Sequence, residues 1–140
     1  MTGVEFLEQI RQINIVILGL REEIENINTL LTNTTVKPKE VDVQTSLPSD
    51  PMADNIIKKV EYEAKLADAI NKQIKIKTEA LALIERMSAD DKSVLILKYL
   101  NCKRVTEMAY TMEISETTVK SLLRRARLNF NELYDHYKTI

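Results

Sequence analysis

Cysteine, histidine and aromatic residues are scarce in this sequence of 140 residues. It has a single cysteine, Cys102, so an intrachain disulfide is excluded and a reducing compartment is favoured. It has one histidine and no cluster of metal-binding side chains, so we expect no metal site. Tryptophan is absent and aromatic residues make up only 5% of the chain, so the hydrophobic core must be aliphatic.

Long apolar runs and Gly-rich loops are also lacking. No segment approaches the roughly 20 consecutive apolar residues of a membrane span, and the N-terminus has no signal-peptide pattern. Neither a phosphate-binding loop nor a nucleophile paired with a base is visible. We therefore expect a cytoplasmic protein with no membrane contact, no enzymatic activity and no cofactor.

The few glycines and prolines divide the chain. Gly3, Gly19 and all three prolines lie before residue 52, and no such residue interrupts the chain from there to the C-terminus. Residues 32–51 are polar, contain the three prolines and have no helical period. We therefore predict an all-α protein in which residues 32–51 form a flexible loop between two long amphipathic helices, over about 2–31 and 52–87.

The first of these helices carries an unbroken heptad pattern. Its apolar residues are spaced alternately by four and three positions: Phe6, Ile10, Ile13, Ile17, Leu20, Ile24, Ile27 and Leu31. A mean period of about 3.5 is the spacing of a coiled-coil seam, so this helix needs a partner helix. Gly19 lies inside the helix at a cost of about 1 kcal/mol relative to alanine, which indicates a place where another helix comes close.

The second helix is predicted to begin at an N-cap, Asp50, with Pro51 in its first turn. Its apolar stripe is less regular and consists of Ile56, Val60, Ala64, Ala67, Ile70, Ile74, Leu81 and Ile84. Two long helices joined by a loop predict an antiparallel helical hairpin or coiled coil over residues 1–87. The pattern fits pairing within one chain and pairing between chains, and we expect a homodimer formed through these helices.

Charge divides the chain in a similar way. Residues 1–91 carry 11 basic and 16 acidic side chains, whereas residues 92–140 carry 9 basic and 5 acidic ones. A net-positive segment in a chain that is slightly acidic overall suits a polyanion as partner. We therefore expect residues 88–140 to form a separate domain with a different partner from that of the long helices.

Three further helices are predicted within residues 88–140. Ser88 is the expected N-cap of a helix of about a dozen residues. The next helix covers about residues 105–112, and the last runs from Ser115 to about His136. A short helix, a three-residue turn and a longer basic helix are typical of a helix-turn-helix.

The last helix has two distinct faces. Its apolar residues recur at spacings of four and three positions and are expected in the core: Val119, Leu123, Ala126 and Phe130. Polar and cationic residues lie on the opposite side: Glu116, Thr117, Lys120, Ser121 and Arg124. Small polar side chains at the N-terminal end of such a helix can reach base edges, and long cations beyond them can reach phosphates.

The stretch SVLILKYLNCKRVTEMAYTMEISETTVKSLLRRARLNFNEL, residues 93–133, resembles region 4 of bacterial sigma factors and the related response-regulator DNA-binding domains. The matching pieces are the apolar run with a cation at 94–98, the triplet 107–109 and the segment 114–127. With the long N-terminal helices ahead of it, the whole chain is similar in architecture to small phage regulators of the ArpU and RinA kind.

The resemblance implies a set of DNA-binding residues. The major-groove positions are Glu116, Thr117, Lys120, Ser121 and Arg124; Arg125 and Arg127 lie near phosphates, and Lys103 and Arg104 complete the expected set. The chain departs from the family where Glu113 and Cys102 replace glycines, Arg104 replaces a Ser or Thr cap, and Leu122 replaces an arginine. A left-handed backbone at Glu113 would be strained, because only glycine adopts it freely.

Together these patterns predict a DNA-binding transcriptional regulator, encoded by a phage or prophage and acting on double-stranded DNA in the cytoplasm of a bacterial host. The last helix would enter the major groove, and the N-terminal helices would dimerise or contact a partner. The resemblance also allows contact with RNA polymerase. The alternative is a coiled-coil assembly protein, such as a small phage packaging subunit, that holds DNA without sequence preference.

Overall fold

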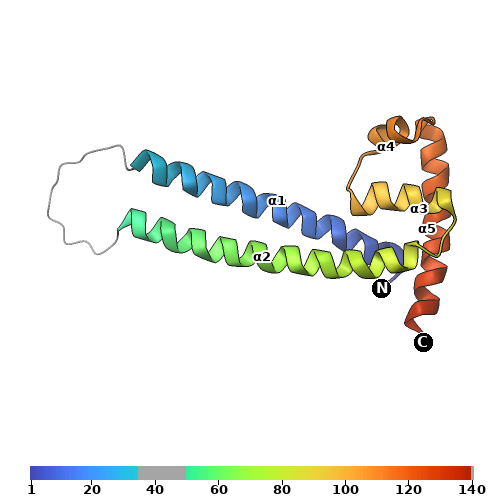
Figure 1. Cartoon of the computed structure of the whole chain (residues 1–140), viewed down its shortest axis with the longest axis horizontal. Helices are drawn as coiled ribbons and strands as arrows, with labels where there is room; N and C mark the ends of the chain where they lie inside the picture. The colour runs from blue at the N-terminus through green and yellow to red at the C-terminus, as the bar shows by residue number, and fades with distance from the viewer. Residues whose placement is uncertain (35–49, 140) are drawn as a thin grey trace. The chain divides into compact units, whose positions relative to one another are not determined.

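The computed structural model describes residues 1–34 and 50–139, and all regular structure in this part of the chain is helical (Figure 1). The elements in chain order are α1 (Gly3–Thr34), α2 (Pro51–Ile84), α3 (Ala89–Leu95), a short π-helical stretch η1 (Ile96–Leu100), α4 (Val105–Met112) and α5 (Glu116–Lys138). The predicted all-α fold class is therefore confirmed. The predicted loop at 32–51 lies, apart from its two ends, outside the described residues.

Three helices begin at the caps that the sequence predicts. The Asp50 carboxylate accepts a hydrogen bond of 3.1 Å from the Met52 amide at the start of α2. The Ser88 hydroxyl accepts one of 3.4 Å from the Asp91 amide in α3, and the Ser115 hydroxyl accepts one of 3.1 Å from Thr118 in α5. Each bond satisfies a backbone donor that has no partner inside its own helix.

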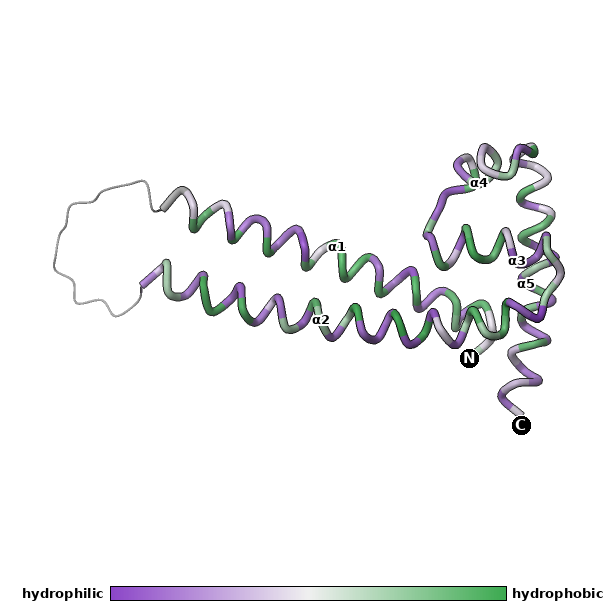
Figure 2. The backbone as a smooth tube through the Cα atoms, in the orientation of Figure 1, coloured by the Kyte–Doolittle hydropathy of each residue, from purple (hydrophilic) through white to green (hydrophobic). Residues whose placement is uncertain are grey.

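The chain divides into two compact units. We call residues 1–14 and 72–140 the core unit, and residues 15–71 the hairpin unit. This packing division differs from the expected boundary between residues 87 and 88, because the first turns of α1 share their hydrophobic core with the C-terminal helices. Figure 2 shows hydrophobic positions recurring along the helices of both units.

The core unit is built around α5. Its largest fully buried side chains come from α1, α2, α3, η1, α4 and α5: Leu7, Ile10, Ile84, Val94, Leu95, Tyr99, Met108, Val119 and Phe130. The start of α1 packs directly on α5, where the Val4 amide donates to Asn131 Oδ1 at 2.9 Å. The rings of Phe6 and Tyr134 stack with their centroids 5.1 Å apart. These contacts join residues more than 120 positions apart in sequence.

The heptad seam that the sequence predicts in α1 faces inward. All eight of its residues, from Phe6 to Leu31, are buried or half-buried, and Ile17 and Ile27 are buried within the hairpin unit. Gly19 lies off this seam and is exposed, with no atom within 4 Å of an added Cβ. The helix contact that the sequence suggested at Gly19 is therefore not made within the described chain.

The stripe predicted for α2 mostly faces away from the protein interior, which is a correction. Ile56, Val60 and Ile74 are 48%, 59% and 56% exposed, and of the eight predicted residues only Ile84 is buried. The less exposed face of α2 has a different heptad phase: Met52, Asn55, Lys59, Tyr62, Leu66, Ala69, Gln73, Ile76, Ala80 and Leu83. Gln73 Nε2 donates to the Ile10 carbonyl at 3.3 Å, so a polar residue occupies the contact with α1.

The physical reason lies at the C-terminal end of α2. Ile76, Ala80 and Leu83 are buried in the hydrophobic core of the core unit. A continuous helix has a fixed angular period, so burying these three residues sets which face of the preceding turns points inward. The more apolar stripe is thereby left on the outside.

Candidate nucleic-acid interface

A helix-turn-helix forms from α4, a three-residue turn and α5. Met108 and Ala109 on α4 are buried together with Val119 and Leu123 on α5, and all four belong to one hydrophobic cluster. Ala109 is small enough to let the two helices approach closely. The expected motif is thus present at the expected residues.

The turn contains a residue in the left-handed conformation. Glu113 ends α4 with φ 58° and ψ 42°, and the amide of Ile114 donates to the Ala109 carbonyl at 3.1 Å. Cys102, in the connection between η1 and α4, has φ 54°. These are the two positions at which the family resemblance predicts glycine, so both side chains are held in a conformation that disfavours them.

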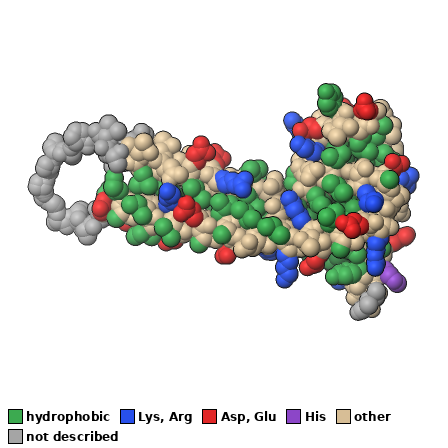
Figure 3. All heavy atoms as spheres, in the orientation of Figure 1, with side chains coloured by type: hydrophobic (Ala, Val, Ile, Leu, Met, Phe, Trp, Pro, Cys, Tyr) green, Lys and Arg blue, Asp and Glu red, His purple; other side chains and the backbone are tan. Residues whose placement is uncertain are grey.

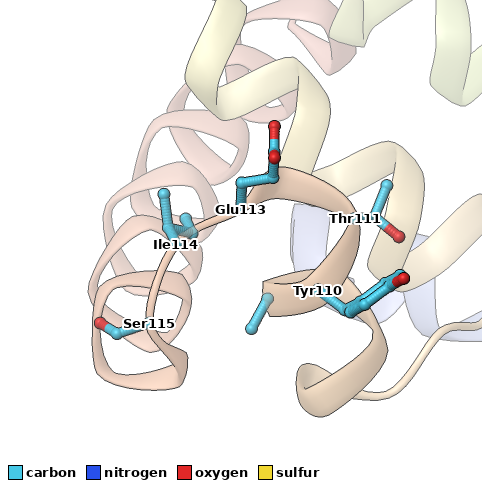
Figure 4. Close-up of a pocket in the computed structure, with 6 residues that line it drawn as sticks. Tyr110, Thr111, Glu113, Ile114 and Ser115 are labelled. Carbon is cyan, nitrogen blue, oxygen red and sulfur yellow. The ribbon is translucent and has the colours of Figure 1, made fainter.

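A shallow depression lies beside this turn and is lined by residues 109–111 and 113–115. Figure 4 shows the side chains of Tyr110 and Ser115 directed to opposite sides of the turn. The polar groups therefore do not converge on a common point. The depression is the hollow left where the chain reverses between the two helices.

The predicted core face and the predicted outer face of α5 are both in their expected places. Val119, Leu123, Ala126 and Phe130 are buried, which confirms the core assignment. The predicted major-groove residues Glu116, Thr117, Lys120, Ser121 and Arg124 are all exposed. Because the inner face is packed, the orientation of these five side chains is fixed by the core.

Arg125 makes an intramolecular ion pair. Its Nε and Nη2 donate to Asp91 Oδ1 at 3.1 and 2.9 Å, and Asn129 Nδ2 donates to Asp91 Oδ2 at 2.8 Å. Burial by itself raises the pKa of Asp91, but the hydrogen bonds from Asn129 and Arg125 and the guanidinium charge outweigh it, and the pKa of this carboxyl falls below its usual value. The Asp91 carboxylate thus ties the start of α3 to the middle of α5.

The other predicted DNA-binding residues differ in their surroundings. Arg127 Nε donates to the Tyr99 hydroxyl at 2.8 Å, and its guanidinium lies 5.9 Å from the centre of that ring. Lys103 is exposed in the connection before α4. The Arg104 amide donates to Glu107 Oε1 at 3.0 Å, which caps α4 in place of a Ser or Thr side chain. That backbone hydrogen bond is the main cause of a lowered pKa at Glu107.

Sequence reasoning did not find the roles of Asp91 and Asn129. The sequence signal at Asp91 is that of an acidic residue three positions after the Ser88 N-cap, as in a capping box, and it gives no indication of a partner on α5. Its partners lie 34 and 38 positions further along the chain, and no local pattern connects them. Sequence reasoning also did not single out Leu128, which is 60% exposed beside the helix-turn-helix.

The sequence that forms this helix-turn-helix matches a known protein family. Residues 77–129 match the family described as Sigma-70, region 4. This region 4 segment begins inside α2 and contains α3, η1, α4 and the part of α5 that carries every predicted groove residue. The predicted resemblance to sigma factor region 4 is therefore confirmed, while the likeness to ArpU and RinA regulators stays a prediction.

Other comparisons add no relative: neither the curated proteins nor the solved structures gave a match. The region 4 segment covers 53 of the 140 residues, so the likeness concerns the C-terminal helices and the end of α2. Within residues 1–34 and 50–139, no helix is long and apolar enough to cross a membrane.

Proposed function

We propose that the protein is a DNA-binding transcriptional regulator, encoded by a phage or prophage and acting in the cytoplasm of a bacterial host. The observation that supports this most is the fixed row of exposed polar and cationic side chains on α5, within the region 4 segment. In a helix-turn-helix this face of the second helix lies in the major groove.

The exposed residues have different roles in this proposal. Thr117 and Ser121 are short and polar, and they lie near the N-terminal end of α5, where they can reach base edges. Lys120 and Arg124 carry long cationic side chains that reach phosphates or guanine. Arg125 is a positioning residue that holds α5 against Asp91, and its half-exposed guanidinium keeps donors for a phosphate.

The long helices supply the second part of the function. We assign them to dimerisation or partner contact, because the hairpin unit leaves many apolar side chains exposed. A homodimer would present two helix-turn-helix modules to two DNA half-sites. RNA polymerase is a further partner in this proposal, by analogy with sigma factor region 4.

DNA binding is tested by the salt dependence of affinity. A duplex selected from a randomised library by the wild-type protein should bind at least about 1,000-fold more tightly than a scrambled duplex. Lys120→Ala should weaken binding and reduce the slope of log K against log salt by about one unit, because one phosphate contact is lost. The matched control is Lys58→Ala, an exposed lysine on α2, which should change neither quantity.

The alternative function predicts a different result. A coiled-coil assembly protein with non-specific DNA binding would bind the selected and scrambled duplexes equally. The exposed apolar side chains of the hairpin unit support this alternative, because they lie outside the helix-turn-helix and are available for contact with a partner. Equal affinity for the two duplexes would reject sequence-specific regulation.

A further inference from the structure

The hairpin unit exposes more apolar side chains than it buries. Among its described residues, Ile17 and Ile27 are the buried hydrophobic side chains. Seven large hydrophobic side chains are exposed: Ile15, Val16, Leu18, Leu30, Ile56, Ile57 and Val60. Figure 3 shows hydrophobic side chains spread over the visible surface of these helices. Two helices alone provide too little interior to cover such surface, and a part of it with helical order is a candidate contact for a further helix.

One exposed stripe on α2 has the order of an interface. Val60, Ala67, Ile74 and Leu81 follow one another at intervals of seven residues, so they lie along one face of this continuous helix. All four are exposed, with Val60 and Ile74 at 59% and 56%. We call these four residues the outer stripe. Its spacing is that of a coiled-coil seam that has no partner within the described chain.

We propose that the outer stripe binds the outer stripe of a second copy of this chain, with the two α2 helices antiparallel. The proposal rests on the self-association part of the proposed function and specifies its surface and direction. A twofold axis near Ile70 would place Val60 against Leu81 of the other copy, and Ala67 against Ile74. Each copy then uses the same surface, as a closed dimer requires.

Charge beside the stripe favours the antiparallel direction. Glu63 and Lys77 lie on the same flank of the stripe, seven positions before and after Ile70. In an antiparallel pair of helices, the same flank of each stripe lies opposite its counterpart on the other copy. Glu63 of each copy therefore lies opposite Lys77 of the other. In a parallel pair the two different flanks meet, and Glu63 comes near Asp68 of the other copy, which is a like-charge contact. No ion pair engages these residues among residues 1–34 and 50–139.

The stripe itself is tested by the oligomeric state of the full chain. Val60→Asp with Ile74→Asp should raise the dimer dissociation constant by about 100-fold or more, as measured by sedimentation equilibrium, because four carboxylates would enter an apolar interface. Ile15→Asp with Val16→Asp is the matched control on exposed apolar residues of α1 and should leave the dissociation constant unchanged. Circular dichroism must show unchanged helix content in both variants.

Three results would overturn the stripe assignment: a monomeric wild-type protein, a dimer that survives the stripe substitutions, or a dimer lost equally in the control. A 20-base-pair duplex carrying one selected half-site separates this proposal from DNA binding, because one helix-turn-helix suffices to bind it. The stripe variant should bind this duplex as tightly as the wild type. If the wild-type protein does not bind the half-site duplex, the proposed function itself is rejected.

The direction is tested by exchanging charges. Glu63→Lys and Lys77→Glu should each weaken the dimer by about 5-fold or more, because two opposite-charge pairs become like-charge pairs. The double variant should restore the wild-type dissociation constant. Lys58→Glu is the control, because Lys58 is exposed and lies two positions before Val60, on the opposite side of α2 from the stripe. A tighter dimer in Glu63→Lys alone would show that the helices pair in parallel, since that change removes a repulsion with Asp68.

Discussion

Single residues at the turns of the DNA-binding module are in an unfavourable backbone conformation. Glu113 and Cys102 have φ values of 58° and 54°, although neither is glycine. A left-handed conformation costs a residue with a Cβ about 1–2 kcal/mol. The structure tolerates this cost because the hydrophobic packing on both sides of each turn determines the path of the backbone.

Replacing Glu113 by glycine should therefore stabilise the protein. Glu113→Gly is expected to raise the free energy of unfolding by about 1 kcal/mol, measured by urea denaturation, since the strain exceeds the entropy that glycine adds to the unfolded chain. Glu132→Gly, in the exposed middle of α5, is the matched control and should lower it by about 1 kcal/mol. A destabilised Glu113→Gly variant would mean that the Glu113 side chain makes a contact that outweighs the strain.

The Asp91 carboxylate should make stability depend on pH. Its pKa is lowered in the folded protein, so its contribution is complete above the pKa of the unfolded state, about 3.9, and is lost as the pH falls through the lower folded value. Asp91→Asn should destabilise the protein by about 2 kcal/mol at pH 7 and flatten the fall in stability towards acid. Urea denaturation at several pH values between neutral and acid measures both effects.

The control for this prediction is Asp135→Asn, which changes an exposed carboxylate in the same helix as Arg125. It should leave the free energy of unfolding at pH 7 within about 0.5 kcal/mol of the wild type. Equal stability of Asp91→Asn and the wild type at pH 7 would contradict the structural role of the ion pair with Arg125.

Among the elements, α1 contains two glycines in opposite environments. A Cβ added at Gly3 would lie 2.8 Å from Phe130 Cδ2 and 3.0 Å from the Tyr134 Cβ, so α1 touches α5 at this point. A Cβ added at Gly19 would meet nothing within 4 Å. Substituting alanine at each position therefore tests close helix packing at Gly3 and helix propensity at Gly19.

Gly3→Ala should destabilise the protein by about 1–3 kcal/mol, because the N-terminal turn of α1 must move away from α5. Gly19→Ala should stabilise it by up to about 1 kcal/mol, because alanine is the better helix former. Urea denaturation at one fixed protein concentration measures both, since association would otherwise change the apparent stability. A tolerated Gly3→Ala would argue against direct packing of this turn on α5.

For the whole molecule, the proposed self-association and the proposed DNA binding would reinforce each other. A dimer holds two copies of α5 at a high effective concentration, so binding of one to a half-site favours binding of the other. The exposed row on α5 needs no dimer to form, because its orientation depends on the core unit of a single chain. In the proposed function, affinity for a single half-site and affinity for a paired site are therefore separate quantities.

Much of the candidate site was predictable from sequence because it depends on local interactions. The Ser115 cap, the inward phase of Val119 and Leu123, and the outward position of Lys120 all follow from residue spacing along one helix. The ion pair of Arg125 was not predictable from residue spacing. Its guanidinium meets Asp91 only because α3 packs against α5, and that contact spans 34 residues.

The sequence by itself determined the helices, their caps, the seam of α1 and the two faces of α5, since each depends on residues within a few turns of one another. Only the tertiary structure decided that α1 begins on α5, that Asp91 holds Arg125, and that the most apolar stripe of α2 faces outward. Those outcomes depend on which faces of the helices are buried in the shared hydrophobic core. For α2, the burial of Ile76, Ala80 and Leu83 determines which face points inward, because a continuous helix cannot turn two different faces to the same partner.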